Sequence, residues 1–171
     1  MSPRMDLERF RDRYRPFALE RRDWPVSAEE FARFSERGPE PVGAASLVWN
    51  QGREILLIRE VSGEGKEAVW ATPGGFAEEG ETPEECARRE ALEEAGVDIE
   101  ITGLTKVVVC DVAHESRTIP FTFFQFEAKH LGSHPKPGER VREVAWFDRL
   151  PDPMHFRADY VEVWRRGGPR L

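Results

Sequence analysis

The sequence predicts an α/β fold that is preceded by a helical extension. Segments rich in Val, Ile, Phe and Trp lie on both sides of one strongly marked helix, and the first forty residues differ from the rest in composition. The chain has 171 residues, of which 39% are hydrophobic, which suffices for one core. We therefore divide it into an extension over residues 1–40 and one domain over residues 41–171.

The extension carries two helix-like patterns joined by a polar connection. Apolar residues recur at helical spacing over residues 7–17. Further on, Ser27 and Glu30 form a capping box before a second apolar pattern that ends at Gly38. We predict that this extension packs on the domain as a lid or brace, because forty residues rarely fold alone. A homodimer through the extension is a further hypothesis.

Strand-like segments begin after Pro41. A turn at residues 50–52 predicts a hairpin between the first two of them, and a polar loop at residues 132–140 precedes the last. A short helix is expected near residues 158–166. The predicted strands cover residues 43–50, 53–61, 104–114, 118–128 and 142–150.

The strongest local signal predicts a helix over residues 83–95. Thr82 can cap it, Pro83 suits the first helical position, and Glu85 completes a capping box with Thr82. Gly96 supplies the C-terminal stop. Both ends of this helix are therefore specified locally, and Ala87, Ala91 and Ala95 form a flank that can approach a sheet closely.

Three carboxylates share one face of this helix. Glu90, Glu93 and Glu94 fall within an arc of about 100° at helical spacing. Like charges three and four residues apart repel, and Glu93 and Glu94 lie near the negative end of the helix dipole. Arg89 can pair with Glu93, but one guanidinium cannot neutralise three carboxylates. We therefore expect a divalent cation at this face.

The turn before the helix fits the same interpretation. Gly74 and Gly75 follow Pro73 and let the backbone approach the site closely, so a carbonyl of this turn can add an oxygen ligand. Oxygen-only ligands favour Mg²⁺ or Mn²⁺ over zinc. Metal held by carboxylates with open positions is the usual apparatus for hydrolysing phosphoryl groups.

This segment resembles the signature of the Nudix hydrolase family, Gx5Ex7REUxEExGU, where U is apolar. Residues 75–97 match it at all seven fixed positions, and Ala91 stands where a larger aliphatic residue is more usual. The matching positions are Gly75, Glu81, Arg89, Glu90, Glu93, Glu94 and Gly96. The order of the strands around the motif is also similar to the family's α/β/α sandwich with a mixed central sheet.

The resemblance implies roles for these residues. It makes Glu93 and Glu94 the main metal ligands, Glu90 a ligand or general base, and the Gly75 carbonyl a further ligand. Arg89 would orient a glutamate. Glu81 would brace the corner between loop and helix.

The family resemblance also implies a reaction. Its members hydrolyse a nucleoside diphosphate linked to another group, with divalent metal and attack of water on phosphorus. The substrate stays open among nucleoside triphosphates, oxidised or not, ADP-ribose and a nucleotide sugar. The alternative function is a Nudix-fold nucleotide sensor or protein-interaction module without turnover, which would not require every catalytic carboxylate.

Other residues carry weaker signals. Family members often draw a further carboxylate from beyond the helix, and Glu143, Glu139 and Glu115 are the candidates here, in that order. Gly63–Lys66 lacks the spacing of a phosphate-binding Walker loop, and we reject that interpretation. Both cysteines are expected to be buried rather than nucleophilic. Aromatic residues that could stack on a base, each more often a core residue, are Trp24, Trp49, Trp70, Phe76 and Phe121.

The net charge of −7 is concentrated rather than spread out. Residues 78–94 contain eight Glu against two Arg, which accounts for most of the imbalance. No positive field favours nucleic acid, so we consider nucleic-acid binding unlikely. No apolar run is long enough to span a membrane, and the charged start does not suit a signal peptide. We therefore expect a cytoplasmic protein that binds a small-molecule nucleotide derivative.

Overall fold

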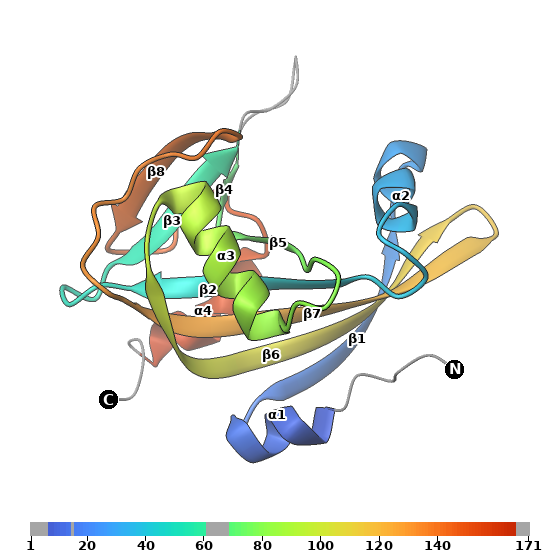
Figure 1. The fold of residues 1–171 in the computed structure, drawn as a ribbon, viewed down its shortest axis with the longest axis horizontal. Coiled ribbons are helices and arrows are strands. Elements are labelled where there is room, and N and C mark those ends of the chain that lie inside the picture. Colours follow the sequence, from blue (N-terminus) through green and yellow to red (C-terminus); the bar gives the residue numbers. More distant parts are fainter. Residues whose placement is uncertain (1–6, 15, 61–68, 167–171) are drawn as a thin grey trace.

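The computed structural model describes residues 7–14, 16–60 and 69–166. The chain combines helices with one mixed sheet (Figure 1). The helices are α1 (Leu7–Arg13), α2 (Ala28–Ser35), α3 (Pro83–Ala95) and α4 (Arg157–Arg165). The strands are β1 (Ala18–Pro25), β2 (Val42–Trp49), β3 (Ile55–Glu60), β4 (Trp70–Ala71), β5 (Gly74–Phe76), β6 (Ile99–His114), β7 (Arg117–His130) and β8 (Val141–Phe147).

The described strands form an eight-stranded sheet with the path β1-β6-β7-β2-β3-β4, while β5 pairs with β2 and β8 pairs with β3. β1 runs parallel to β6, and β2 runs parallel to β7. The remaining pairs are antiparallel, including the predicted hairpin of β2 and β3. The predicted α/β class and mixed sheet are therefore confirmed.

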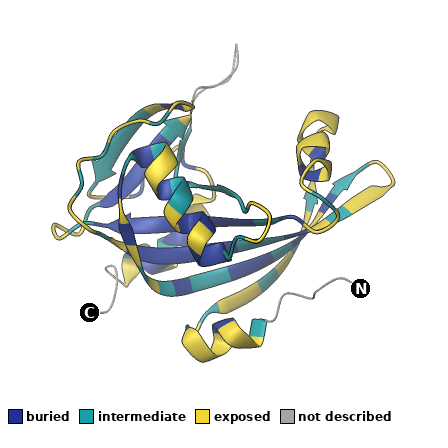
Figure 2. Cartoon of the chain, viewed as in Figure 1, coloured by how far each residue is buried: buried dark blue, intermediate teal, exposed yellow. Residues whose placement is uncertain are grey.

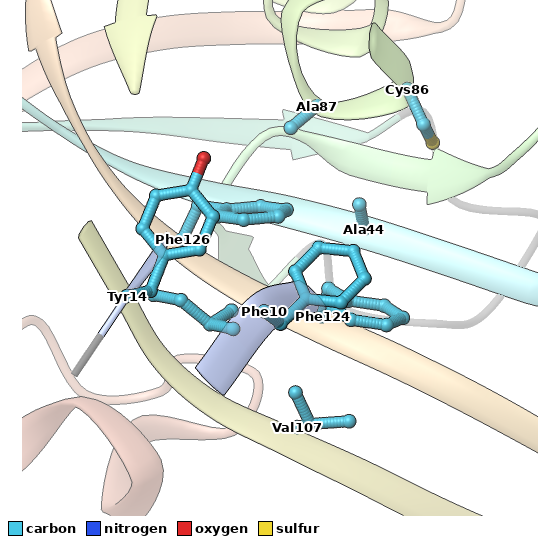
Figure 3. Packing of buried hydrophobic residues seen from close by; sticks show 9 residues of the cluster. Phe10, Tyr14, Ala44, Cys86, Ala87, Val107, Phe124 and Phe126 are labelled. Atoms are coloured by element: carbon cyan, nitrogen blue, oxygen red, sulfur yellow. The ribbon is translucent and has the colours of Figure 1, made fainter. Parts of the chain in front are cut away.

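Alternate residues of one strand serve two cores on opposite faces of the sheet. Val107 packs with Phe10 of α1 and Ala87 of α3, in the cluster drawn in Figure 3. Its neighbour Val108 packs instead with Phe31 of α2. Since successive side chains of a strand point to opposite faces, α1 and α3 cover one face and α2 covers the other.

The same alternation places α4 opposite α3. Val48 of β2 joins Ala91 and Ala95 of α3 in one cluster, whereas Leu47 joins Tyr160 of α4 in another. Buried residues lie along the central strands and on α3 (Figure 2), and α4 buries Tyr160 and Val163. The molecule is therefore a three-layer α/β/α arrangement, with α2 and α4 on the face away from α3.

The extension is only partly helical. Both expected helices form, and α2 has the Ser27–Glu30 capping box with Phe31 and Phe34 buried. The predicted polar connection is wrong, however, because Ala18–Pro25 forms β1, which pairs with β6 from Ala18–Lys106 to Pro25–Ala113. The sequence does not predict this strand because one face of β1 is exposed and carries polar residues. The extension thus adds a strand to the sheet.

The remaining elements are close to their predicted positions. The final helix and the five predicted strands are present, but β6 begins at Ile99 and takes in five residues not expected in it. The short strands β4 and β5 were not predicted. The Gly63–Lys66 segment lies outside the described residues. Among the described helices, none is long and apolar enough to cross a membrane.

Candidate active site

The helix α3 is fixed by the caps that its sequence predicts. Thr82 Oγ1 accepts a hydrogen bond from the Glu85 amide at 3.2 Å, and the Thr82 amide donates to Glu85 Oε2 at 2.8 Å. Gly96 ends the helix with a left-handed φ of 67°. The three alanines of its flank are all 0% exposed. Because this flank is pressed on the sheet, the carboxylate face of α3 is held beside the β4–β5 region.

Arg89 lies at the centre of a network of hydrogen bonds. Its Nε and Nη2 donate to the two carboxylate oxygens of Glu81 at 2.8 and 3.0 Å. Its Nη1 donates to Glu90 at 2.9 Å and to Glu93 at 3.1 Å, and Nη2 also donates to the Phe76 carbonyl at 2.9 Å. The hydrogen bonds that Arg89 donates to Glu81 lower the pKa of the Glu81 carboxyl. One guanidinium therefore joins the loop before α3 to two of its carboxylates.

Glu94 has a different environment. Its Oε2 accepts a hydrogen bond from the Gly74 amide at 2.8 Å. Burial, followed by the charges of Glu90, Glu60 and Glu93, raises the pKa of Glu94 to about 8, although the Gly74 hydrogen bond opposes this effect. Burial also raises the pKa of Glu90, against the influence of Arg89. Negative charge is therefore poorly compensated around Glu94.

The glycine turn allows the close contact that the sequence predicts. A Cβ added to Gly75 would lie 2.4 Å from Glu90 Oε1, and one added to Gly74 would lie 2.6 Å from the Ala44 carbonyl. Neither position has room for a side chain. The Gly75 carbonyl lies 3.6 Å from Cys86 Sγ, which donates to it. The turn therefore places backbone next to the carboxylates, as expected.

The extra carboxylate candidates lie in three different places. Glu143 on β8 pairs with Arg59 of β3. Glu139 is exposed in the loop whose Gly138 amide donates to the Glu94 carbonyl at 3.0 Å, at the end of α3. Glu115 is at the tip of the β6–β7 hairpin, which points away from α3 (Figure 1). The structure brings none of these side chains into a recorded contact with Glu90, Glu93 or Glu94.

The residue that sequence reasoning missed is Glu60. It ends β3, and its charge raises the pKa of Glu94. The signal was available only in space, since 33 residues of sequence separate Glu60 from Glu94. Within the described ranges, no group of three or more His, Cys, Asp or Glu side chains is arranged to hold a metal ion. Glu90 and Glu93 are turned toward Arg89, and Glu94 toward Gly74.

A cavity of about 500 Å³ adjoins this site. Glu60, Gly74 and Gly75 line one part of it, and the rest lies on the face of the sheet that α2 and α4 cover. Its aromatic lining comes from β1, α2, β5, β7, α4 and the residue before α4. The Trp, Phe and Tyr side chains are Trp24, Phe34, Phe76, Phe121, Phe123, Phe156 and Tyr160. A cavity of this size suits a small organic ligand.

The five aromatic residues considered from the sequence fall into two groups. Trp49 is 3% exposed and stacks on Trp164, and Trp70 packs edge-on against Phe147, so neither lines this cavity. Trp24, Phe76 and Phe121 do line it. Both cysteines are buried as expected, and burial raises the pKa of the Cys86 thiol to about 12. Cys86 is therefore a protonated core residue and not a nucleophile.

A comparison with known families identifies the family of the chain. The NUDIX domain family matches residues 39–152, which is more than half of the chain. The chain belongs to the NUDIX hydrolase family. The resemblance that the motif of residues 75–97 indicates is thereby confirmed, and this NUDIX chain is an enzyme of the hydrolase class.

Individual relatives extend the likeness over most of the chain. It is 29% identical over 124 residues to a MutT-like protein of Streptomyces ambofaciens, covering 72% of this chain and 73% of that one. It is 31% identical over 134 residues to an ADP-ribose pyrophosphatase of Methanocaldococcus jannaschii, covering 74% and 76%. Other curated relatives are longer, and the chain spans 35% and 37% of two of them.

A solved structure gives the same fold. A NUDIX hydrolase from Nitrosomonas europaea aligns with a TM-score of 0.57 and 27% identity, over 77% of this chain and 75% of that one. The family's sandwich is therefore shared by the described part of this chain. The likeness supports the hydrolysis of nucleotide pyrophosphates as the general reaction.

Proposed function

We propose that the chain hydrolyses the pyrophosphate linkage of a nucleoside diphosphate derivative, by metal-dependent attack of water on phosphorus. The observation that carries this proposal is the imbalance of charge around α3. Arg89 donates to Glu81, Glu90 and Glu93, whereas Glu94, beside the charge of Glu60, receives only a backbone amide in the part of the chain that is described. A bound cation would supply the missing positive charge.

The donors at this face suit a hard divalent cation. Carboxylate and carbonyl oxygens are the ligands that Mg²⁺ and Mn²⁺ prefer. The groups that would hold the ion are the Gly75 carbonyl and the carboxylates of Glu90, Glu93 and Glu94. Glu60 is a further carboxylate whose charge acts on Glu94. A divalent cation bound here neutralises phosphate oxygens and lowers the pKa of the attacking water. We choose Mg²⁺ as the ion, with Mn²⁺ as the substitute.

The residues of the chain have separate tasks in this proposal. Arg89 is a positioning residue, because it orients Glu90 and Glu93 from a point fixed by both oxygens of Glu81. The Gly74 amide holds Glu94 at 2.8 Å. Glu90 is either a ligand or the general base that takes the proton of the water. Gly96 acts on the site indirectly, because it ends α3 two residues after Glu94.

The choice of substrate class rests on the family and its relatives. The Methanocaldococcus relative is named an ADP-ribose pyrophosphatase, which supports a nucleoside diphosphate derivative for this chain as well. ADP-ribose, a nucleotide sugar and a nucleoside triphosphate are the compounds to compare. Dimerisation through residues 1–40 and a cytoplasmic location stay predictions, and light scattering tests the first of them.

The test is a panel of these nucleotides incubated with Mg²⁺ or Mn²⁺ in isotopically labelled water. We expect mass spectrometry to find cleavage of the pyrophosphate bridge, with the label in a phosphate group. Glu93→Gln and Glu94→Gln should lose about 100-fold or more of the activity. Glu100→Gln, an exposed position on β6, is the matched control and should keep it. No metal-dependent turnover of any diphosphate by the parent would favour a nucleotide-sensing module instead.

A further inference from the structure

The cavity that Glu60, Gly74 and Gly75 line is also lined by aromatic side chains that the hydrolytic residues do not use. Trp24 of β1 lies there edge-on to Phe34 of α2, with ring centroids 5.6 Å apart at 75°. It also lies edge-on to Phe156, with centroids 6.0 Å apart at 83°. The same cavity is lined by Gly74 and Gly75. One ligand could therefore contact the aromatic end and the carboxylate site together.

Phe156 is unusual in two respects. Its side chain is among the exposed large hydrophobic ones, at 46%, although it lines a cavity. Its backbone has a φ of 53° in the left-handed region, which is unfavourable for a residue other than glycine. Such strain is retained at sites where it serves binding more often than at random positions. The ring offers an uncovered aromatic surface next to Trp24.

The cavity also contains a buried acceptor without a partner. Gln125 is 2% exposed and lines the cavity, and its Nε2 donates to Asp159 Oδ2 at 3.2 Å. Asp159 also accepts hydrogen bonds from Arg22 and Lys106, so it is ionised. The NH2 end of the Gln125 side chain must therefore face it, and the oxygen points elsewhere. Gln125 Oε1 has no hydrogen-bond partner among the described residues. A buried acceptor of this kind is costly unless a donor reaches it.

We propose that Trp24 and Phe156 bind the aromatic base of the substrate and that Gln125 Oε1 accepts a hydrogen bond from an N–H of this base. The inference rests on the proposed function, since it extends the ligand from the carboxylate site into the same cavity. It selects nucleoside derivatives over base-free diphosphates. The proposal also gives the extension a role in ligand binding, because Trp24 lies on β1 and Phe34, which contacts Trp24, lies on α2.

The first experiment compares two unreactive probes in the presence of Mg²⁺, with binding measured by calorimetry. The probes are the α,β-methylene analogue of adenosine diphosphate and methylenediphosphonate, which has no base. Trp24→Ala and Phe156→Ala should bind the nucleotide analogue about tenfold or more weakly and bind methylenediphosphonate like the parent. Trp24→Phe should recover most of the loss. Leu19→Ala, an exposed position on the same strand, is the matched control and should change neither affinity.

The second experiment tests the acceptor. The probe is a nucleotide analogue whose purine ring has neither an amino group nor a ring N–H. The parent should bind it about five- to tenfold more weakly than the adenine analogue, and Gln125→Met should bind both equally. Unchanged melting temperatures and unchanged binding of methylenediphosphonate show that the variants are folded.

The outcomes separate this inference from the function beneath it. Normal binding of the nucleotide analogue by folded Trp24→Ala and Phe156→Ala would overturn the inference, even if the parent hydrolyses nucleotides. Loss of that binding alone would support it, even if no diphosphate in the panel is cleaved. Equal loss of both probes would also overturn it, because the residues would then act on the diphosphate site or on the fold.

Discussion

Two glutamates of α3, one near each end, show how differently a fold can treat a carboxylate. Glu84 in the first turn is 4% exposed and has three partners from the extension. Arg9, Arg13 and Tyr14 reach its oxygens at 3.0, 3.6 and 3.3 Å. Glu94 in the last turn accepts a hydrogen bond from the Gly74 amide, has no cationic partner among the described residues, and lies beside further carboxylates. The charge of Glu84 is therefore balanced within the chain, whereas that of Glu94 is not balanced by the residues described.

This difference indicates different functions. A buried carboxylate whose charge is balanced by cationic partners contributes to the fold and needs no further cation. A carboxylate beside like charges destabilises the fold unless a cation binds next to it. We therefore propose that the same residue type on the same helix serves packing at one end and metal binding at the other. Exchanging glutamate for glutamine at each end should separate the two roles.

The largest expected effect is on turnover. Glu94→Gln should lower kcat about 100-fold or more, because a neutral amide cannot replace an anionic ligand. Glu84→Gln should keep kcat within about twofold, since no recorded contact joins it to the cavity or to Arg89. Initial rates on the nucleotide of the panel that the parent cleaves fastest measure both. Comparable losses in the two variants would contradict the division of roles.

The next effect is stabilisation by metal. Mg²⁺ or Mn²⁺ at about 100 times its dissociation constant should stabilise the parent by about 2.7 kcal/mol and raise its melting temperature. Glu84→Gln should show the same shift from a lower starting point. Glu94→Gln should show little or none. A full shift in Glu94→Gln would mean that the ion binds elsewhere.

A smaller effect is expected on stability without metal. Glu84→Gln should lower the free energy of unfolding by about 1–3 kcal/mol, because it removes the charge that Arg9 and Arg13 share. Glu94→Gln should leave the stability unchanged or raise it, because a poorly compensated charge is removed. Urea denaturation in the presence of a chelator measures both. A larger loss in Glu94→Gln than in Glu84→Gln would reverse the comparison.

How far the sequence reaches follows from where each signal lies. The bounds of α3 could be predicted because Thr82, Glu85 and Gly96 act on backbone groups within one turn of themselves. The contact of Arg89 with Glu93 follows from helical spacing, because the two residues are four positions apart. By contrast, β1 is recognisable only through β6, more than eighty residues further on, because its exposed polar residues do not read as a strand.

The aromatic end of the cavity was beyond sequence reasoning for a similar reason. Trp24 was one of five aromatic candidates, and only the pairing of β1 with β6 brings it to the cavity. Phe156 and Gln125 gave no signal, since their interest lies in a left-handed backbone and in an unpaired oxygen. Glu60 likewise became relevant only when β3 was placed beside α3. Local caps are written in the sequence, whereas sites shared between distant strands are not.

The smallest effect concerns acid, and Asp159 extends the comparison to a second compensated carboxylate. Burial raises its pKa, but hydrogen bonds from Arg22, Gln125 and Lys106 outweigh burial and hold the pKa below its usual value. A lowered pKa in the folded state contributes stability that is present above the unfolded value of about 3.8 and is lost as the pH falls through the folded value. As the pH falls below about 4, the parent should therefore lose stability more steeply than Asp159→Asn. Urea denaturation at a series of pH values measures the free energy of unfolding of both proteins. An equal loss of stability in the two proteins would contradict a lowered pKa of Asp159.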